Sequence, residues 1–186
     1  MSTLLEQHAH ALAEFDRRVG DIGPDQWSAP TPCTDWDVRT LVGHVTDEQR
    51  WVPYLLDGGT VADAGDRFSG GDDDPAAAWR RAAEAARAAF EADGALDRNV
   101  SLSSGVVSAR DYLWQLTVDL AVHAWDLARG IGGDERLDPE LVRRIHAELD
   151  KDDRDYAASG LYDPPVRVSS SADLQARMLA LLGRRA

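Results

Sequence analysis

The sequence predicts an all-α protein, a bundle of four or five antiparallel helices with two long connections. Apolar residues recur every three or four positions along four long segments, which is the period of an amphipathic helix. Proline, glycine and aspartate gather between these segments, where they end one helix and cap the next. The chain has the length of one ordinary domain, so residues 1–186 are expected to form a single domain.

The first two helices are predicted from their apolar stripes. The first begins near Leu4 and ends before Gly20, where glycine and proline interrupt the pattern. In the second helix, Thr34 is the expected N-cap and Asp37, three residues on, its capping-box partner. The apolar stripe of the second helix comprises Val38, Leu41, Val42, Val45, Val52 and Leu56.

A third helix is expected after an exposed connection, residues 57–74, that is rich in glycine and aspartate. Asp74 is its expected N-cap, and Pro75 suits the first helical position because that position needs no backbone N–H. Its expected inner face comprises Trp79, Ala82, Ala83, Ala86 and Phe90. Alternation around Val100 and Val106 predicts a small hairpin before the next helix.

The central helix is expected over residues 109–129, with Ser108 as its N-cap and Asp111 as capping-box partner. It is apolar around most of its circumference, which predicts that it is the most buried element. Residues 139–150 are expected to form a further helix, residues 162–171 an extended segment and residues 172–183 a terminal helix. Together these last elements form a short C-terminal extension of the bundle.

Composition excludes several classes of function. A formal net charge of −13 argues against nucleic acid as a partner, because phosphate binding needs clustered lysine and arginine. The sequence has no apolar run long enough for a membrane-spanning helix, and its first fifteen residues lack the basic start of a signal peptide. A cytoplasmic location is therefore expected. Cys33 is the single cysteine, which excludes an intramolecular disulfide and a cysteine-based zinc cluster within one chain.

Three polar residues interrupt the most apolar helix. Asp119, His123 and Asp126 are spaced i, i+4 and i+7, so they share one side of the helix beside its apolar stripe. On the second helix, His44 and Glu48 hold the corresponding position beside their own stripe. If the two sides face each other, His44, Asp119 and His123 converge between the helices.

The residues alone leave three interpretations of this convergence open. Imidazole nitrogens and a carboxylate oxygen are ligands that borderline divalent metals take, which favours a metal site. Glu48 and Asp126 would then supply a further ligand, an acceptor that orients a ligating imidazole, or a catalytic proton relay. The alternatives are an acid–base pair and a satisfied polar patch held by i, i+4 hydrogen bonds. Cys33 is set aside as a nucleophile, because nothing in the sequence places a base beside it.

The segments "PTPCTDWDVRTLVGHV" (30–45), "DLAVHAWDLARG" (119–130), "YDPPVRV" (162–168) and "RMLALLGR" (177–184) resemble a known family in the same order. This is an actinobacterial metal-binding family related to the N-terminal domain of mycothiol-dependent maleylpyruvate isomerase, within the DinB/YfiT-like superfamily. The resemblance implies a DinB-like four-helix bundle with long crossover connections. It also implies that His44, Asp119 and His123 hold a divalent metal, zinc.

Two departures from the isomerase bear on function. The isomerase usually has glutamate at the position of Asp119, and aspartate is one methylene shorter. The isomerase also carries a C-terminal domain that contributes to its active site, whereas only about fifty-five residues follow the central helix here. Isomerisation of maleylpyruvate itself is therefore not expected.

The resemblance implies an enzyme in which the metal activates a low-molecular-weight thiol, mycothiol, as a thiolate for transfer to an electrophile or for isomerisation. The alternatives are a metal-dependent hydrolase, in which the same metal activates water, and a metal-binding sensor or interaction module without catalysis. The expected partners are a small thiol and an electrophilic substrate, with neither nucleic acid nor membrane. Both a monomer and a homodimer are compatible with the sequence.

Overall fold

A computed structural model describes residues 3–65, 67–68, 71–151, 162–169 and 171–186. The chain divides into two compact units, residues 1–135 and residues 136–186. The larger unit contains α1 (Leu4–Gly20), α2 (Val38–Leu56), α3 (Val61–Ala64), α4 (Pro75–Glu91), the 3-10 helix η1 (Ala95–Asp97), β1 (Asn99–Leu102), β2 (Gly105–Ser108) and α5 (Ala109–Ile131). The smaller unit contains α6 (Pro139–Leu149) and α7 (Leu174–Leu181). The predicted all-α class is confirmed; the single domain over residues 1–186 stays a prediction.

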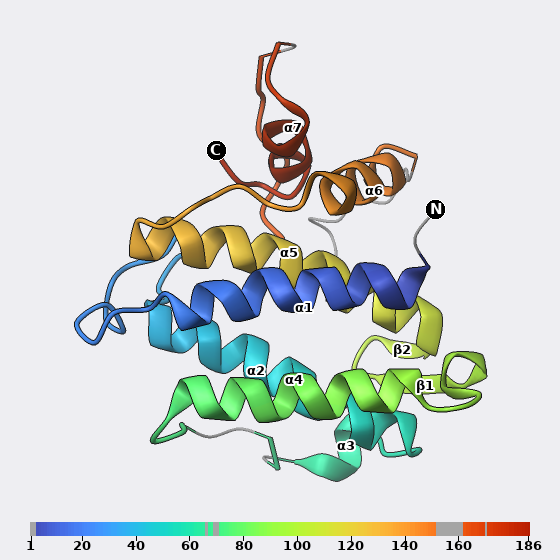
Figure 1. Cartoon of the computed structure of the whole chain (residues 1–186). Coiled ribbons are helices and arrows are strands. Elements are labelled where there is room, and N and C mark those ends of the chain that lie inside the picture. The colour runs from blue at the N-terminus through green and yellow to red at the C-terminus, as the bar shows by residue number, and fades with distance from the viewer. Residues whose placement is uncertain (1–2, 66, 69–70, 152–161, 170) are drawn as a thin grey trace. The chain divides into compact units, whose positions relative to one another are not determined.

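Four long helices, α1, α2, α4 and α5, form the bundle of the larger unit. α1 packs against α5 and α4, and α2 packs against α4 and α5 (Figure 1). The chain colours show that α1 and α5 run in one direction and that α2 and α4 run in the other (Figure 1). The pair α1 and α5 is therefore antiparallel to the pair α2 and α4, as expected. Within each pair, however, the two helices are parallel to each other. The reason is the connection 57–74, which runs back along the bundle before α4 begins.

Side-chain caps fix where the helices of the bundle begin. Asp74 accepts a hydrogen bond from the backbone of Ala77, and Ser108 accepts one from Asp111, as the sequence predicts for α4 and α5. The N-cap of α2 is a correction. Asp37, rather than Thr34, caps this helix, and its carboxylate accepts from the backbone N–H of Thr40 at 2.8 Å.

The connections contain one unpredicted element and one confirmed one. Within 57–74, Thr60 caps the four-residue helix α3, which is too short to show an apolar period. Strands β1 and β2 form the expected antiparallel hairpin, in which Asn99 pairs with Ser108 and Leu102 with Gly105. The hairpin lies in the connection between α4 and α5.

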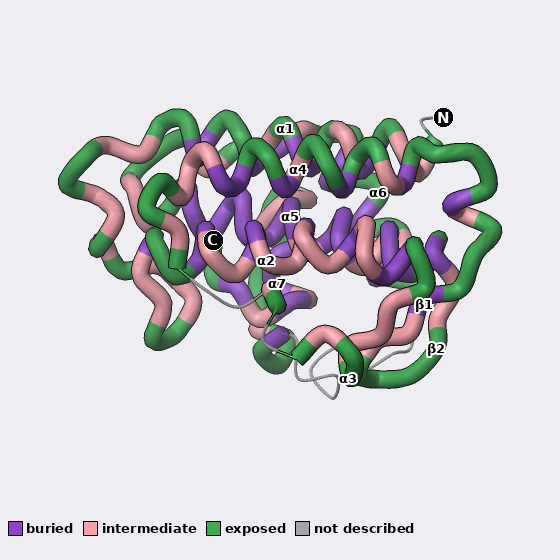
Figure 2. The backbone as a smooth tube through the Cα atoms, turned by 90° about the horizontal axis from the view of Figure 1, so that it is seen from below, coloured by how far each residue is buried: buried purple, intermediate pink, exposed green. Residues whose placement is uncertain are grey.

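The core of the bundle is centred on α5, the most buried helix, as predicted. Figure 2 shows buried and exposed residues alternating along α1 and α4, as expected for helices with one buried face. The expected inner face of α4 is buried except for Ala83, which is partly exposed. One hydrophobic cluster, here called the apolar end, comprises Val52, Leu55, Leu56, Ala86, Phe90, Val100, Ala109, Tyr112, Leu113 and Leu116. The Tyr112 hydroxyl is its one polar side-chain group.

The smaller unit is held together by α6 and α7, which pack against each other. The side-chain carbonyl of Gln175 accepts a hydrogen bond from the backbone of Leu137 at 2.9 Å. The extended segment before α7 is tied back by the backbone N–H of Val166, which donates to the carbonyl of Ala180 at 2.9 Å. Across the described parts of both units, none of the helices combines the length and apolarity needed to cross a bilayer.

Candidate metal centre

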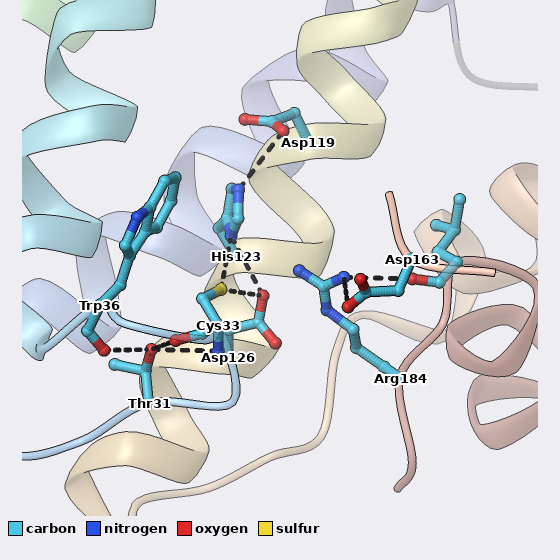
Figure 3. A network of polar contacts seen from close by, with 9 residues as sticks. Thr31, Cys33, Trp36, Asp119, His123, Asp126, Asp163 and Arg184 are labelled. Atoms are coloured by element: carbon cyan, nitrogen blue, oxygen red, sulfur yellow. Dashed lines mark hydrogen bonds and ion pairs between the residues drawn. The ribbon is translucent and has the colours of Figure 1, made fainter. Parts of the chain in front are cut away.

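The three polar residues of α5 lie on one side of the helix, where His123 contacts both Asp119 and Asp126 (Figure 3). Nε2 of His123 lies 3.4 Å from Oδ1 of Asp119, one turn before it. Nδ1 of His123 lies 3.1 Å from Oδ2 of Asp126, which is fully buried. Both ring nitrogens of His123 are therefore oriented by carboxylates, and the ring is fixed in one orientation.

His44 of α2 completes the predicted set. Each of His44, Asp119 and His123 offers one ligand atom, and these atoms all lie within 4.8 Å of one another. The rings of His44 and His123 meet edge to face, with their centroids 5.5 Å apart. The sides of α2 and α5 predicted to face each other thus do so, and the three residues converge. Whether they hold a metal stays a prediction.

The loop before α2 shapes the approach to these residues. The hydroxyl of Thr31 donates to the carbonyl of Trp36 at 2.8 Å and accepts from the backbone of Cys33 at 3.2 Å. Asp35 has a φ of 67°, a left-handed conformation that aspartate tolerates better than most residues. This tight turn delays the start of α2 past Thr34, which is why Asp37 is the cap. A β-carbon at Gly130 of α5 would come within 3.2 Å of the loop backbone, so glycine there permits the close packing.

The loop places the side chains of Trp36 and Cys33 against His123 (Figure 3), and that of Trp36 also against His44. The ring of Trp36 lies 4.7 Å from that of His44 and 6.0 Å from that of His123, centroid to centroid. The thiol of Cys33 donates to Oδ2 of Asp126 at 3.2 Å, and its sulfur lies 3.8 Å from Nδ1 of His123. Sequence reasoning missed this contact, since no spacing rule connects residues ninety positions apart. Cys33 and Asp126 form a second candidate ligand group with His123.

The position of the cysteine differs from that of a nucleophile activated by histidine. In such a pair the histidine accepts the thiol proton on one nitrogen and is oriented through the other. Here the thiol of Cys33 donates to Asp126 rather than to the ring, and Asp126 also contacts Nδ1 of His123, while Nε2 is directed toward Asp119. The geometry therefore favours Asp126 as the acceptor for both groups, leaving Nε2 of His123 available as a ligand atom.

His44 and His123 differ in the direction in which their pKa is shifted. Burial lowers the pKa of His44, and the charge of His123 adds to this effect although Asp119 opposes it, so His44 is neutral. Burial also acts to lower the pKa of His123, but Asp119, Asp126 and Cys33 together outweigh it and raise that pKa to about 10. Without a metal, His123 thus holds a positive charge between two carboxylates.

Glu48 lies one turn after His44 in α2. Burial, together with the negative charges of Asp119 and Asp47, raises the pKa of Glu48 to about 7. Burial raises the pKa of the Tyr112 hydroxyl, and the charges of Glu48 and Asp119 add to this effect, which places all three groups in one electrostatic environment. A carboxyl group with a pKa near neutrality is suited to accept and release a proton.

The donor set fits a divalent cation better than a self-satisfied polar patch. Oδ2 of Asp119 is buried and makes no hydrogen bond to any described residue. No described residue hydrogen-bonds the ring of His44, which is partly buried. Two ligand atoms of a tetrahedral ion at 2.0–2.2 Å lie about 3.5 Å apart, so these three atoms, which lie within 4.8 Å of one another, would draw closer together around a metal. The buried Oδ2 of Asp119 is the atom that a metal would satisfy.

Comparison with known proteins identifies relatives of this chain. The model of the mycothiol maleylpyruvate isomerase N-terminal domain matches residues 8–128. Two uncharacterized proteins of Mycobacterium tuberculosis, from strains CDC 1551 and H37Rv, are each 32% identical to this chain over 148 residues. Each match covers 77% of this chain and 76% of the relative.

Two solved structures share the fold. They are crystal structures of the mycothiol-dependent maleylpyruvate isomerase and of a mutant of that enzyme in which a histidine is replaced by alanine. Both superpose with a TM-score of 0.62, at 16% and 14% identity, and cover 80% of this chain and 72% of theirs. The DinB-like helical fold expected from the sequence is thereby confirmed.

Proposed function

Because the chain belongs to the mycothiol maleylpyruvate isomerase N-terminal domain family, we propose that it binds a divalent metal and acts on a low-molecular-weight thiol. The ligands in this proposal are His44, Asp119 and His123, and the metal is zinc. The observation that carries it is the convergence of one ligand atom from each of these three residues within 4.8 Å, together with the buried Oδ2 of Asp119, which makes no hydrogen bond to any described residue. A buried polar atom of this kind costs stability unless a ligand satisfies it.

The proposed reaction is transfer of a thiol such as mycothiol to an electrophile, or a thiol-dependent isomerisation. A bound divalent metal lowers the pKa of a coordinating thiol and keeps it as the thiolate. Asp126 holds Nδ1 of His123 and so fixes the ring with Nε2 toward the centre. Glu48, whose pKa is raised to about 7, accepts or returns a proton at its carboxyl oxygen. Trp36 covers the histidines on the loop side and limits access of water.

The metal is tested first. Protein expressed in zinc-replete medium is expected to carry about one equivalent of zinc per chain, and His44→Ala less than a tenth. His10→Ala, an exposed histidine of α1, is the matched control and should keep the full equivalent. Circular dichroism must show that both variants are folded. Equal metal contents in the two variants would refute the proposed ligand set.

The thiol chemistry is tested separately. Mycothiol is supplied with a panel of electrophiles, including maleylpyruvate, to the zinc-loaded protein and to His44→Ala. Metal-dependent product formation above the uncatalysed rate supports a transferase or isomerase. Product formation from ester or amide substrates without thiol would instead indicate a hydrolase. If no substrate reacts and calorimetry detects no binding of mycothiol, the metal-binding module without catalysis is the better description.

A further inference from the structure

A cavity in the larger unit shares no residue with the candidate metal centre. After α3 the chain runs back along α4 (Figure 1), and an open cavity of about 510 Å³ lies between this segment, α2 and α4. Small-molecule sites in proteins commonly enclose about 300–1,000 Å³. Arg50, Arg67 and Arg81 line the cavity, one from each of its three walls.

One of these arginines is already paired. Arg50 of α2 donates two hydrogen bonds to the carboxylate of Asp72, at 2.8 and 2.9 Å, and one to Asp47 at 2.9 Å. Asp72 also lines the cavity, and its carboxylate is held by this bidentate contact, while Arg50 shares its single positive charge between Asp72 and Asp47. The pair ties the connecting segment to α2 and fixes one wall of the cavity.

The other two arginines that line the cavity, Arg67 and Arg81, differ from Arg50 in their contacts. Neither Arg67 nor Arg81 forms an ion pair with any residue that the structure describes. The guanidinium of Arg67 lies 5.2 Å over the ring of Tyr54 and 5.6 Å over that of Phe68, and these cation–π contacts hold it in place. The lining thus holds three arginines and one carboxylate, and this local excess of positive charge, in a chain with a net charge of −13, attracts an anion.

The rest of the cavity is apolar. Phe68 and Pro53 line it together with alanine methyl groups of α4. Phe68 is fixed by Trp51, whose ring centroid lies 4.6 Å away, and by Tyr54 at 5.4 Å. A hydrated inorganic anion would leave this surface exposed, whereas a ligand with a hydrocarbon portion would cover it.

We propose that this cavity binds a small organic carboxylate, with the carboxylate oxygens held by Arg67 and Arg81 and the hydrocarbon portion against Phe68 and Pro53. Arginine presents paired N–H donors that match a carboxylate in geometry and charge. The proposal does not depend on the candidate metal centre.

Adipate, a six-carbon dicarboxylate, is the probe, titrated by calorimetry into full-length protein stripped of metal with EDTA. Saturable binding of one adipate per chain is expected at millimolar concentrations, and 1,6-hexanediol, its uncharged counterpart, should not bind. Arg67→Ala and Arg81→Ala should each weaken adipate binding about tenfold or more. Arg80→Ala removes the neighbouring arginine of α4, which does not line the cavity. This substitution should change the affinity for adipate less than about twofold.

A second measurement separates this site from the metal centre. Adipate should bind His44→Ala as tightly as the unaltered protein, whatever that variant does to metal content. Equal affinities of Arg80→Ala and Arg81→Ala for adipate would overturn the proposal, as would binding of inorganic phosphate as tight as that of adipate. Absence of adipate binding to the folded protein would overturn it as well.

Discussion

Helices α2 and α5 contain two contrasting regions within a few turns of each other. At the apolar end, Leu55 of α2 and Leu113 of α5 are almost completely buried among other hydrocarbon side chains. In the candidate metal centre, the same helices contribute His44 and Asp119, and the buried Oδ2 of Asp119 makes no hydrogen bond to any described residue. Apolar packing tolerates many side chains of similar volume, whereas a ligand set requires particular atoms at particular positions. We infer that stability resides mainly in the first region and chemistry in the second.

The largest effect, on the free energy of unfolding, is expected from a substitution at the apolar end. Leu113→Ala is expected to lower the free energy of unfolding by about 2–5 kcal/mol, because it removes buried methyl groups and leaves a cavity. Val106→Ala, at an exposed hairpin position, should change it by less than about 0.5 kcal/mol. Urea denaturation of both variants checks this. The folded fraction of Leu113→Ala should keep its metal, and loss of metal from that fraction would show that the two regions are not separate.

The next-largest effect is expected on the free energy of unfolding, because burying the carboxyl group of Glu48 beside the candidate metal centre destabilises the fold. The pKa of Glu48 is about 7 in the folded protein and has its ordinary value near 4.5 in the unfolded chain. As far as Glu48 is concerned, the free energy of unfolding of the metal-free protein should therefore be highest below pH 4.5. It should fall as the pH rises from 4.5 to 7. Glu48→Gln does not titrate, so it should be the more stable protein at pH 7, by at most about 3 kcal/mol.

Denaturation at pH 5 and pH 7 measures this difference. Glu84→Gln, at an exposed position of α4, is the control and should keep the pH dependence of the unaltered protein. If Glu48→Gln loses the same stability between the two pH values as the unaltered protein, burial of Glu48 is not the cause.

A smaller effect is expected on metal affinity. His123 is protonated without metal, since its pKa is raised to about 10, and a metal at Nε2 must displace that proton. Zinc affinity should therefore rise about tenfold for each pH unit between pH 6.5 and pH 8, with one proton released per ion. Competition with a chelator of known affinity at three pH values tests this. An affinity independent of pH would mean that His123 is not a ligand.

The smallest effect is expected at the loop. Cys33→Ser should change zinc affinity less than about threefold, because a serine hydroxyl also donates a hydrogen bond to Asp126. Chelator competition at one pH suffices for the comparison. A loss of tenfold or more would show that the sulfur is itself a ligand, and would make Cys33, His123 and Asp126 the preferred site.

The two regions also differ in how far the sequence predicts them. The long helices and the caps Asp74 and Ser108 follow from local patterns, because an apolar stripe and a capping side chain act within a few residues. The convergence of His44 with His123 follows from their place beside the stripes that pack together. Local patterns do not specify the direction of α4, because that depends on where the connection 57–74 leads.

The contacts of the loop 30–37 were beyond prediction for a related reason. The left-handed turn at Asp35 shifts the start of α2 and brings Cys33 to Asp126, but it leaves no periodic signal. The position of a loop is set by its packing against distant residues, here by the space that Gly130 leaves on α5. The cavity beside Arg67 and Arg81 likewise depends on a connection whose path no spacing rule specifies.

The placement of Asp119, His123 and Asp126 on one uninterrupted helix has a consequence for how this chain can change in length. Inserting or deleting one residue between positions 119 and 126 rotates everything beyond it by about 100° around the helix axis. One carboxylate would then leave the ring of His123, and the apolar residues that alternate with the polar ones would turn outward. Among its described residues, the connection 57–74 contains only the four-residue helix α3, so a change in length there rotates no long helix. We expect insertions and deletions among natural relatives to gather there and to be absent between 119 and 126.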